Sequence, residues 1–168
     1  MDSHIVFLGL GTNLGDKEAN LNLAVEEISK RVGKVLSLSA CYVTEPWGFS
    51  SDNHFLNAVC CVMSELSPYG VLSVTQDIER ELGRMKKSVN GCYSDRMIDI
   101  DILLYDEICL NTEDLIIPHP LMGQRDFVMI PLEEIAPDVA DKVRKGLFSM
   151  DRGSFLDSDT AKSTADDC

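Results

Sequence analysis

The sequence predicts an α+β fold, in which helices pack on an antiparallel sheet. Two observations support this prediction. Residues 98–102 read Ile-Asp-Ile-Asp-Ile, and alternation of apolar and polar residues is the periodicity of a β-strand. Residues 17–32 and 68–82 instead carry apolar residues at helical spacing, and a helix-capping residue precedes each segment. Along the chain, the strand and helix signals follow the order β-α-β-β-α-β.

The first half of this pattern comprises two strands and a helix. A short apolar strand is predicted over His4–Leu10. The stretch GLGTNLGD closes it, and we interpret this stretch as a flexible strand-to-helix turn because its glycines do not fit the G-x-G-x-x-G spacing. A helix is predicted over Lys17–Val32, with Asp16 as its N-cap and Gly33 where it stops. The second strand is predicted over Val35–Val43.

The second half comprises two more strands and another helix. The third strand is predicted over Phe55–Met63. The second helix begins at Pro68, with Ser67 as its cap and Gly83 just beyond its end. The Ile-Asp-Ile-Asp-Ile segment forms the fourth strand, and a short helix is predicted near Pro131–Ile135. This order of elements is the ferredoxin-like sandwich, an antiparallel sheet with helices packed on one face.

Length and composition favour one domain. Residues 1–148 are sufficient to bury a core, whereas residues 149–168 are acidic and polar and are predicted to form a disordered tail. No apolar stretch approaches the length of a membrane span, and no basic region precedes the first apolar segment. None of the six cysteines forms a C-x-x-C pair, so we interpret them as reduced thiols and expect a cytoplasmic protein. We also expect the protein to be a monomer.

The charge distribution narrows the class of ligand. A net charge of −13 argues against binding to nucleic acids or anionic membranes, because their phosphates would be repelled. Five basic residues nevertheless fall in one short segment, at Arg80, Arg84, Lys86, Lys87 and Arg96. This cluster favours a small anionic ligand, and a solvated helix end followed by a loop is the alternative interpretation.

Asp99 and Asp101 are candidate metal ligands. Two residues apart on a strand, their Cβ atoms lie about 6.6 Å apart on the same face. At an effective dielectric constant near 20, two like charges at that distance repel by about 2.5 kcal/mol. A Mg²⁺ ion would offset this repulsion, since Mg²⁺ takes carboxylate oxygens and fills its shell with water and substrate phosphates. The alternative is a strand with one solvated face.

Several other polar residues are candidates for ligand contact. Asn57 interrupts an apolar strand and shares a face with Phe55, so the amide and the ring together suit a planar heterocycle. An Asn at a strand end facing water is the alternative. Gln76 and Glu79 lie three residues apart on the second predicted helix and point the same way. His119 lies between two prolines, where a structural role is more common than a catalytic one.

Taken together, these stretches resemble the 6-hydroxymethyl-7,8-dihydropterin pyrophosphokinase family over Ile5–Pro137. The resemblance rests on the order and spacing of LGLGTNLGD, YVTEPWG, FLNAV, LGRMKK, DRMIDIDILLYD, IPHP and RDFVMIPLEEIAP. It implies the ferredoxin-like fold and a folate-pathway reaction in which pyrophosphate moves from ATP to a pterin alcohol and AMP leaves.

The resemblance also implies roles for individual residues. Asp99 and Asp101 would bind two Mg²⁺ ions and act in catalysis with Arg84 and Lys86. The residues implied to contact ATP are Gln76, Glu79, Arg84, Lys86, Arg96, His119 and Arg125. The residues implied to form the pterin pocket are Thr44, Pro46, Phe55, Asn57 and Phe127.

Several positions depart from the family pattern. Lys86 replaces an arginine and keeps the charge without the bidentate geometry, and Tyr93 replaces a tryptophan. Ser94-Asp95 precede Arg96 where the family often has Gly-Pro, and Pro120 replaces an aromatic residue. The residues alone also leave two other classes of function open. One is a non-catalytic ligand-binding module of the same fold, and the other is a metal-dependent phosphohydrolase that uses the acids without a pterin.

Overall fold

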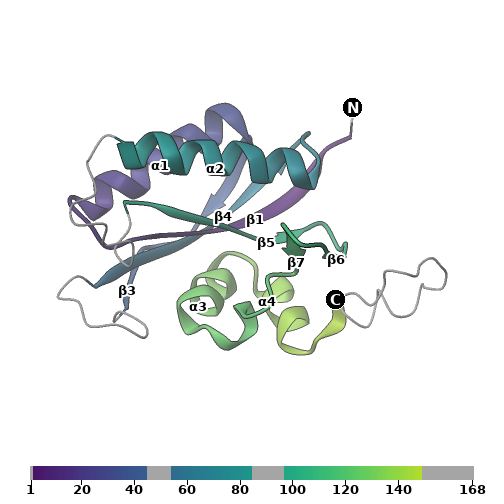
Figure 1. Ribbon diagram of the computed structural model, residues 1–168. Coiled ribbons are helices and arrows are strands. Elements are labelled where there is room, and N and C mark those ends of the chain that lie inside the picture. Colours follow the sequence, from purple (N-terminus) through teal and green to yellow (C-terminus); the bar gives the residue numbers. More distant parts are fainter. Residues whose placement is uncertain (1, 45–53, 85–96, 149–168) are drawn as a thin grey trace.

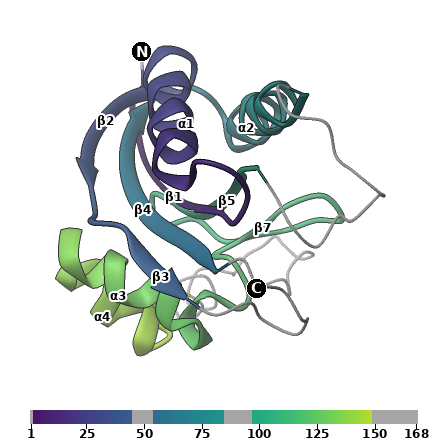
Figure 2. The same ribbon diagram turned by 90° about the vertical axis from the view of Figure 1, so that its left-hand side faces the viewer.

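The computed structural model describes residues 2–44, 54–84 and 97–148, which form a curved antiparallel sheet between two layers of helices (Figures 1 and 2). The strands of this sheet are β1 (His4–Thr12), β2 (Gly33–Leu38), β3 (Tyr42–Thr44), β4 (Phe55–Ser64) and β5 (Asp99–Tyr105). They lie in the order β2-β4-β1-β5, and β3 pairs with the first residues of β4. A small hairpin of β6 (Leu110–Asn111) and β7 (Ile116–Ile117) follows β5.

Helices α1 (Lys17–Arg31) and α2 (Pro68–Arg84) cover one face of the sheet (Figure 1). Both predicted caps are confirmed, because the Asp16 carboxylate accepts from the Ala19 N–H at 3.2 Å and the Ser67 hydroxyl accepts from the Gly70 N–H at 3.0 Å. The core beneath these helices includes alternate residues of β1 and β5, together with the residue before β5: Val6, Leu8, Leu10, Ile98, Ile100 and Ile102. The isoleucines next to Asp99 and Asp101 therefore face α1 and α2, as the alternation predicts.

The opposite face of the sheet is covered by η1 (Met122–Gln124), α3 (Asp126–Ile135) and α4 (Pro137–Arg144) (Figure 1). The prediction of helices on one face only was therefore incomplete. Phe7 and Val59 point to this second face and are buried beneath Val128 and Leu132. The helix expected to begin near Pro131 begins at Asp126 instead, and Pro131 lies buried inside it.

Other predicted boundaries also differ from the structure. The second predicted strand is divided into β2 and β3 at Ser39. The Ser39 N–H donates to the Val59 carbonyl at 2.9 Å, and the Ser39 hydroxyl accepts from the Val59 N–H at 3.0 Å. Gly33 opens β2, where a Cβ would lie 2.1 Å from the Met63 carbonyl oxygen, so close strand approach requires a glycine. Gly83 lies within α2 and not beyond its end.

The described cysteines support the expectation of reduced thiols. Cys60 and Cys61 lie on opposite faces of β4, and burial raises the pKa of both thiols, that of Cys60 to about 12. Both are free, as are Cys41 and Cys109. In the part of the chain that the structure describes, no helix has the length and apolar character needed to cross a bilayer. The tail predicted over residues 149–168 lies outside the described residues.

Candidate active site

The face of the sheet that carries α3 has a strip of backbone without side chains along β1. Gly9 and Gly11 form this strip, and both lie within β1. Our interpretation of these glycines as a strand-to-helix turn was therefore wrong. In the strand register, Gly11 lies between Asp99 on β5 and Asn57 on β4, and Gly9 lies opposite Asp101. Because cross-strand partners share a face, carboxylates border the glycine strip on one side and an amide borders it on the other.

The amide side of the site, which we define as Thr44, Phe55 and Asn57, is held by a hydrogen bond. Asn57 is 5% exposed, and its Nδ2 donates to the Thr44 hydroxyl at 2.8 Å. A Cβ at Gly11 would lie 3.0 Å from Asn57 Oδ1 and 3.8 Å from Phe55 Cδ1, so both side chains reach over the glycine strip. The predicted pairing of an amide with an aromatic ring on one face is confirmed.

Helix α3 contributes Phe127 from its first turn. Phe127 is half-buried, and the guanidinium carbon of Arg125 lies 5.5 Å from the centre of its ring. Arg125 occupies the N-cap position of α3 and donates no side-chain cap bond there. The pair brings one aromatic ring and one cation together at the start of the helix.

The carboxylate side of the site, which we define as Glu79, Asp99 and Asp101, concentrates negative charge. Glu79 lies on α2 and accepts a hydrogen bond from the Ile100 N–H at 2.6 Å, between the two aspartates. The pKa of Glu79 is raised to about 7, chiefly by burial. The negative charges of Asp99 and Asp101 and a hydrogen bond with Asp99 raise it further, against the opposing effect of the Ile100 N–H.

This donor set fits a hard divalent cation. Asp99 and Asp101 are half-buried and supply carboxylate oxygens, which are the ligands that Mg²⁺ prefers. Among the described residues, no group of three or more metal-ligating side chains is assembled. Two protein carboxylates suffice for Mg²⁺, since the ion usually keeps several waters and takes further oxygens from substrate phosphates.

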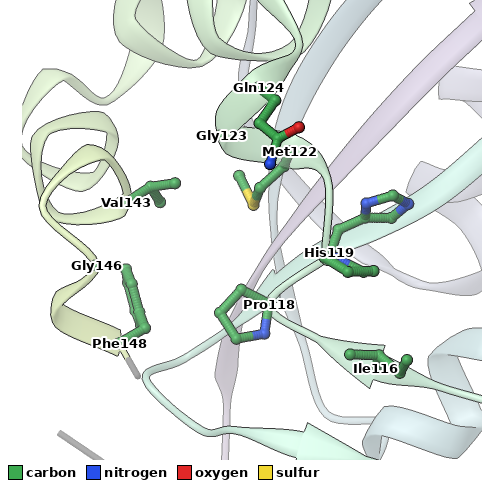
Figure 3. A pocket seen from close by; sticks show the side chains of 10 residues that line it. Ile116, Pro118, His119, Met122, Gly123, Gln124, Val143, Gly146 and Phe148 are labelled. Carbon is green, nitrogen blue, oxygen red and sulfur yellow. The ribbon is translucent and has the colours of Figure 1, made fainter. Parts of the chain in front are cut away.

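His119 lies beside the carboxylates, next to a separate cavity. The backbone N–H of His119 donates to the Leu103 carbonyl at 3.0 Å, and this bond connects the segment after β7 to β5. Burial lowers the pKa of His119, and the positive charge of Arg125 lowers it further while Asp99 opposes both effects. The cavity, of about 330 Å³, is lined mainly by apolar residues that include Met122, Val143 and Phe148, and the imidazole ring extends away from it (Figure 3).

The structure brings many, but not all, of the predicted site residues into view. Thr44, Phe55, Asn57, Glu79, Asp99, Asp101, His119, Arg125 and Phe127 lie on or beside this face. Gln76 is exposed on α2. Pro46, Lys86, Tyr93 and Arg96 lie outside the described residues, as does the side chain of Arg84.

Sequence reasoning missed the two glycines of the strip. Their only signal was their alternation, because Gly9 and Gly11 lie two residues apart and therefore share a strand face. Glycine in a strand commonly marks a close approach by another group, which is the interpretation that the register supports.

These features define the chain as a ferredoxin-like α+β protein with a cluster of polar side chains, the candidate site, on one face of its sheet. A crystal structure of HPPK-DHPS in complex with substrates matches 92% of this chain with a TM-score of 0.64 at 16% identity. A wild-type HPPK-DHPS structure from Plasmodium falciparum matches 90% of it with a TM-score of 0.62. The chain spans 45% of each of these longer chains, and the likeness shows the fold.

Sequence comparison identifies the family. The pattern of the 7,8-dihydro-6-hydroxymethylpterin-pyrophosphokinase (HPPK) family matches residues 7–137, and the chain belongs to this family. A 2-amino-4-hydroxy-6-hydroxymethyldihydropteridine pyrophosphokinase of Porphyromonas gingivalis is 54% identical over 134 residues, covering 79% of this chain and 91% of that protein. The enzyme of the same name from Methylorubrum extorquens is 42% identical, covering 86% and 92%. A folic acid synthesis protein of Dictyostelium discoideum is 39% identical, and the match covers 20% of its length.

Proposed function

We propose that this chain transfers the pyrophosphoryl group of ATP to the hydroxymethyl oxygen of 6-hydroxymethyl-7,8-dihydropterin, giving AMP and the pterin diphosphate for folate synthesis. The observation that carries this proposal is the placement of Asn57 and Asp99 on either side of Gly11. Strands lie about 4.8 Å apart, so the two backbones are separated by about 9.6 Å. This separation suits a flat heterocycle lying beside the phosphate chain that reacts with it.

The amide side binds and orients the pterin. The hydrogen bond from Asn57 Nδ2 to Thr44 sets the orientation of the amide, and Asn57 Oδ1 lies above Gly11. In that position Oδ1 accepts from a ring N–H, while Phe55 and Phe127 stack on the ring faces. Pro46 completes the pocket in this assignment. An oriented, largely buried amide discriminates well, because an analogue without the matching polar edge leaves the amide unpaired.

Asp99 and Asp101 would hold two Mg²⁺ ions on the carboxylate side. When bound, these ions would neutralise the charge of the triphosphate and promote ionisation of the substrate hydroxyl. The Glu79 contact with the Ile100 N–H keeps the strand between the two aspartates in place. The hydroxymethyl oxygen of the pterin attacks the β-phosphorus of ATP, and AMP is the leaving group.

Basic and polar residues around the carboxylates bind ATP. The assigned contacts are Gln76, Glu79, Arg84, Lys86, Arg96, His119 and Arg125. The lowered pKa of His119 favours a neutral imidazole, which can donate or accept a hydrogen bond but brings no charge. Arg84 and Lys86 neutralise phosphate charge in the transition state and, with the residues that follow α2, exclude water that would hydrolyse ATP.

The chain is proposed to work as a monomer in the cytoplasm. The free cysteines among the described residues support a reducing compartment.

Product identity tests the proposed function most directly. Purified protein is incubated with Mg²⁺ and ATP, with and without 6-hydroxymethyl-7,8-dihydropterin, and AMP, ADP and phosphate are resolved. We expect AMP only when the pterin is present, in equal molar amount to the pterin diphosphate. Release of ADP or phosphate without the pterin would indicate a phosphohydrolase, and ATP binding without turnover would indicate a ligand-binding module.

A further inference from the structure

Glu134 connects helix α3 to strand β3 and to Ala40, just before that strand, through three hydrogen bonds. Its carboxylate accepts from the Ala40 N–H at 3.2 and 3.1 Å, and from the Tyr42 hydroxyl at 2.6 Å. Hydrogen bonds to a charged acceptor are stronger than those between neutral groups. A single side chain therefore fixes the last turn of α3 to the strand that begins at Tyr42.

The same helix carries a proposed pterin contact on the same side. Phe127 and Glu134 lie seven residues apart on α3, which is close to two full turns. The two side chains consequently share a helix face, about 10.5 Å apart along the axis. If Glu134 is held against β3, the direction in which Phe127 projects is also held.

The strand end of this connection leads to the amide side of the site. Tyr42 lies opposite Asn57 in the strand register, and Thr44, two residues further along β3, accepts the hydrogen bond from Asn57 Nδ2. The Glu134 hydrogen bond raises the pKa of the Tyr42 phenol, with burial adding to this effect. A continuous series of contacts thus leads from Glu134 through Tyr42 and β3 to the Asn57 amide, which faces the proposed pterin site.

We propose that Glu134 is a positioning residue for the pterin, which fixes the separation between Phe127 on α3 and the Thr44–Asn57 pair on the sheet. The inference rests on the proposed pterin pocket and extends it to a residue that does not touch the ligand. It predicts that Glu134 affects affinity for the flat heterocycle more strongly than affinity for ATP, because Arg125, at the start of α3, is the only proposed ATP contact on that helix.

The test compares Glu134→Ala with a neighbouring variant. The pterin Kd is measured from the fluorescence of the ring, and the KM for ATP is measured at saturating pterin. In Glu134→Ala we expect the pterin Kd to rise about tenfold while the KM for ATP stays within about twofold. Glu134→Gln retains an acceptor oxygen and is expected to restore most of the affinity. Glu133→Ala is the matched control, since Glu133 lies on the same helix but pairs with Arg144 at 2.9 Å.

Amide hydrogen exchange at Ala40 reports on the connection independently of catalysis. Loss of the Glu134 carboxylate should accelerate exchange of the Ala40 N–H in the folded protein. Tyr42→Phe removes one hydroxyl without altering the helix, so it provides the same test if Glu134→Ala does not fold, with a smaller rise in pterin Kd.

Faster exchange with an unchanged pterin Kd would overturn the proposal, as would unchanged exchange at Ala40. Equal rises in the pterin Kd and the ATP KM would also overturn it, because they would indicate a general structural role. Pterin binding and amide exchange do not depend on turnover, so these readings remain valid if the proposed reaction itself fails.

Discussion

The two sides of the candidate site are held together by opposite kinds of interaction. On the amide side, Asn57 has a neutral hydrogen-bond partner in Thr44 at 2.8 Å. On the carboxylate side, burial raises the pKa of Glu79 to about 7, and the negative charges of Asp99 and Asp101 contribute to the rise. On the first side the protein alone orients the amide, whereas the second side accumulates like charges in a partly buried place.

This difference indicates how each side recognises its ligand. A preoriented amide selects by shape and hydrogen-bond pattern, because its geometry exists before the ligand arrives. A group of acids selects by charge, because a cation relieves the repulsion between them. Substitutions on the two sides should therefore affect different measurements, and the following experiments test whether they do.

The largest effect is expected from Asp99→Asn. We expect turnover to fall by about 10³-fold or more, since the proposed metal ligand loses its charge. The thermal midpoint of the metal-free variant should be equal to or above that of the unaltered chain, because one of the repelling charges is removed. AMP formation and thermal unfolding are measured in parallel. Asp138→Asn, which removes an exposed carboxylate from α4, serves as the charge-matched control. A near-normal rate in Asp99→Asn would contradict the metal assignment.

An intermediate effect, confined to the amide side, is expected from Gly11→Ala. The new methyl group would lie 3.0 Å from Asn57 Oδ1, so the amide must move. Displacing a buried, oriented polar group costs about 2 kcal/mol, which corresponds to a pterin Kd raised roughly 30-fold. Pterin binding and the KM for ATP are measured on the same preparation, and only the first should change.

Gly9→Ala is the matched control for this substitution. Its methyl group would meet Leu103 side-chain atoms at 3.4 Å, an ordinary van der Waals contact. It adds the same group to the same strand but leaves Asn57 undisturbed. Equal losses of pterin affinity in the two variants would show that the glycine strip matters for its backbone and not for the space above Gly11.

The smallest effect concerns the pH dependence of stability on the carboxylate side. The pKa of Glu79 is about 7 in the folded chain against an ordinary value of 4.5, so the folded state binds the proton more tightly. Its contribution to the free energy of unfolding is therefore full below about pH 4.5 and is lost as pH rises through about 7. Glu79→Gln should remove this dependence and stabilise the metal-free chain at pH 8 by on the order of 1 kcal/mol, after allowance for partial exposure.

Denaturant unfolding at several pH values, with and without Mg²⁺, measures the effect. Mg²⁺ should reduce the difference in free energy of unfolding between the unaltered chain and Glu79→Gln, because it screens the charges that surround Glu79. A Glu79→Gln difference that did not vary between pH 4.5 and 7 would exclude titration of this residue as its cause.

The elements that carry strong local patterns were predicted from the sequence. The alternation around Asp99 and Asp101 is visible without any tertiary information, because burial of one strand face requires it. Asn57 was recognised because a polar amide in an apolar strand needs a partner. Its partner, Thr44, was named only through the family resemblance, since the two lie thirteen residues apart and meet through strand pairing.

The remaining features depend on tertiary arrangement. The glycines of β1 suggest a turn locally, and only the register places Gly11 between Asn57 and Asp99. Glu133 and Glu134 are neighbours of the same type, and only the docking of α3 across β3 brings Glu134 to Ala40 and Tyr42. Pro131 suggests a helix start, although it lies within α3, where the hydrophobic burial of the helix face outweighs a missing N–H.

Two glutamates also determine what the borders of the sheet can do. In the described part of the chain, β5 forms one edge of the sheet, and β2 and β3 form the other. Glu79 accepts from the Ile100 N–H on the first edge, and Glu134 accepts from the Ala40 N–H between the two strands of the second. An incoming strand from another molecule would need free N–H groups for its own carbonyls and would meet a carboxylate at each of these two. Both glutamates therefore act against edge-to-edge pairing with another chain.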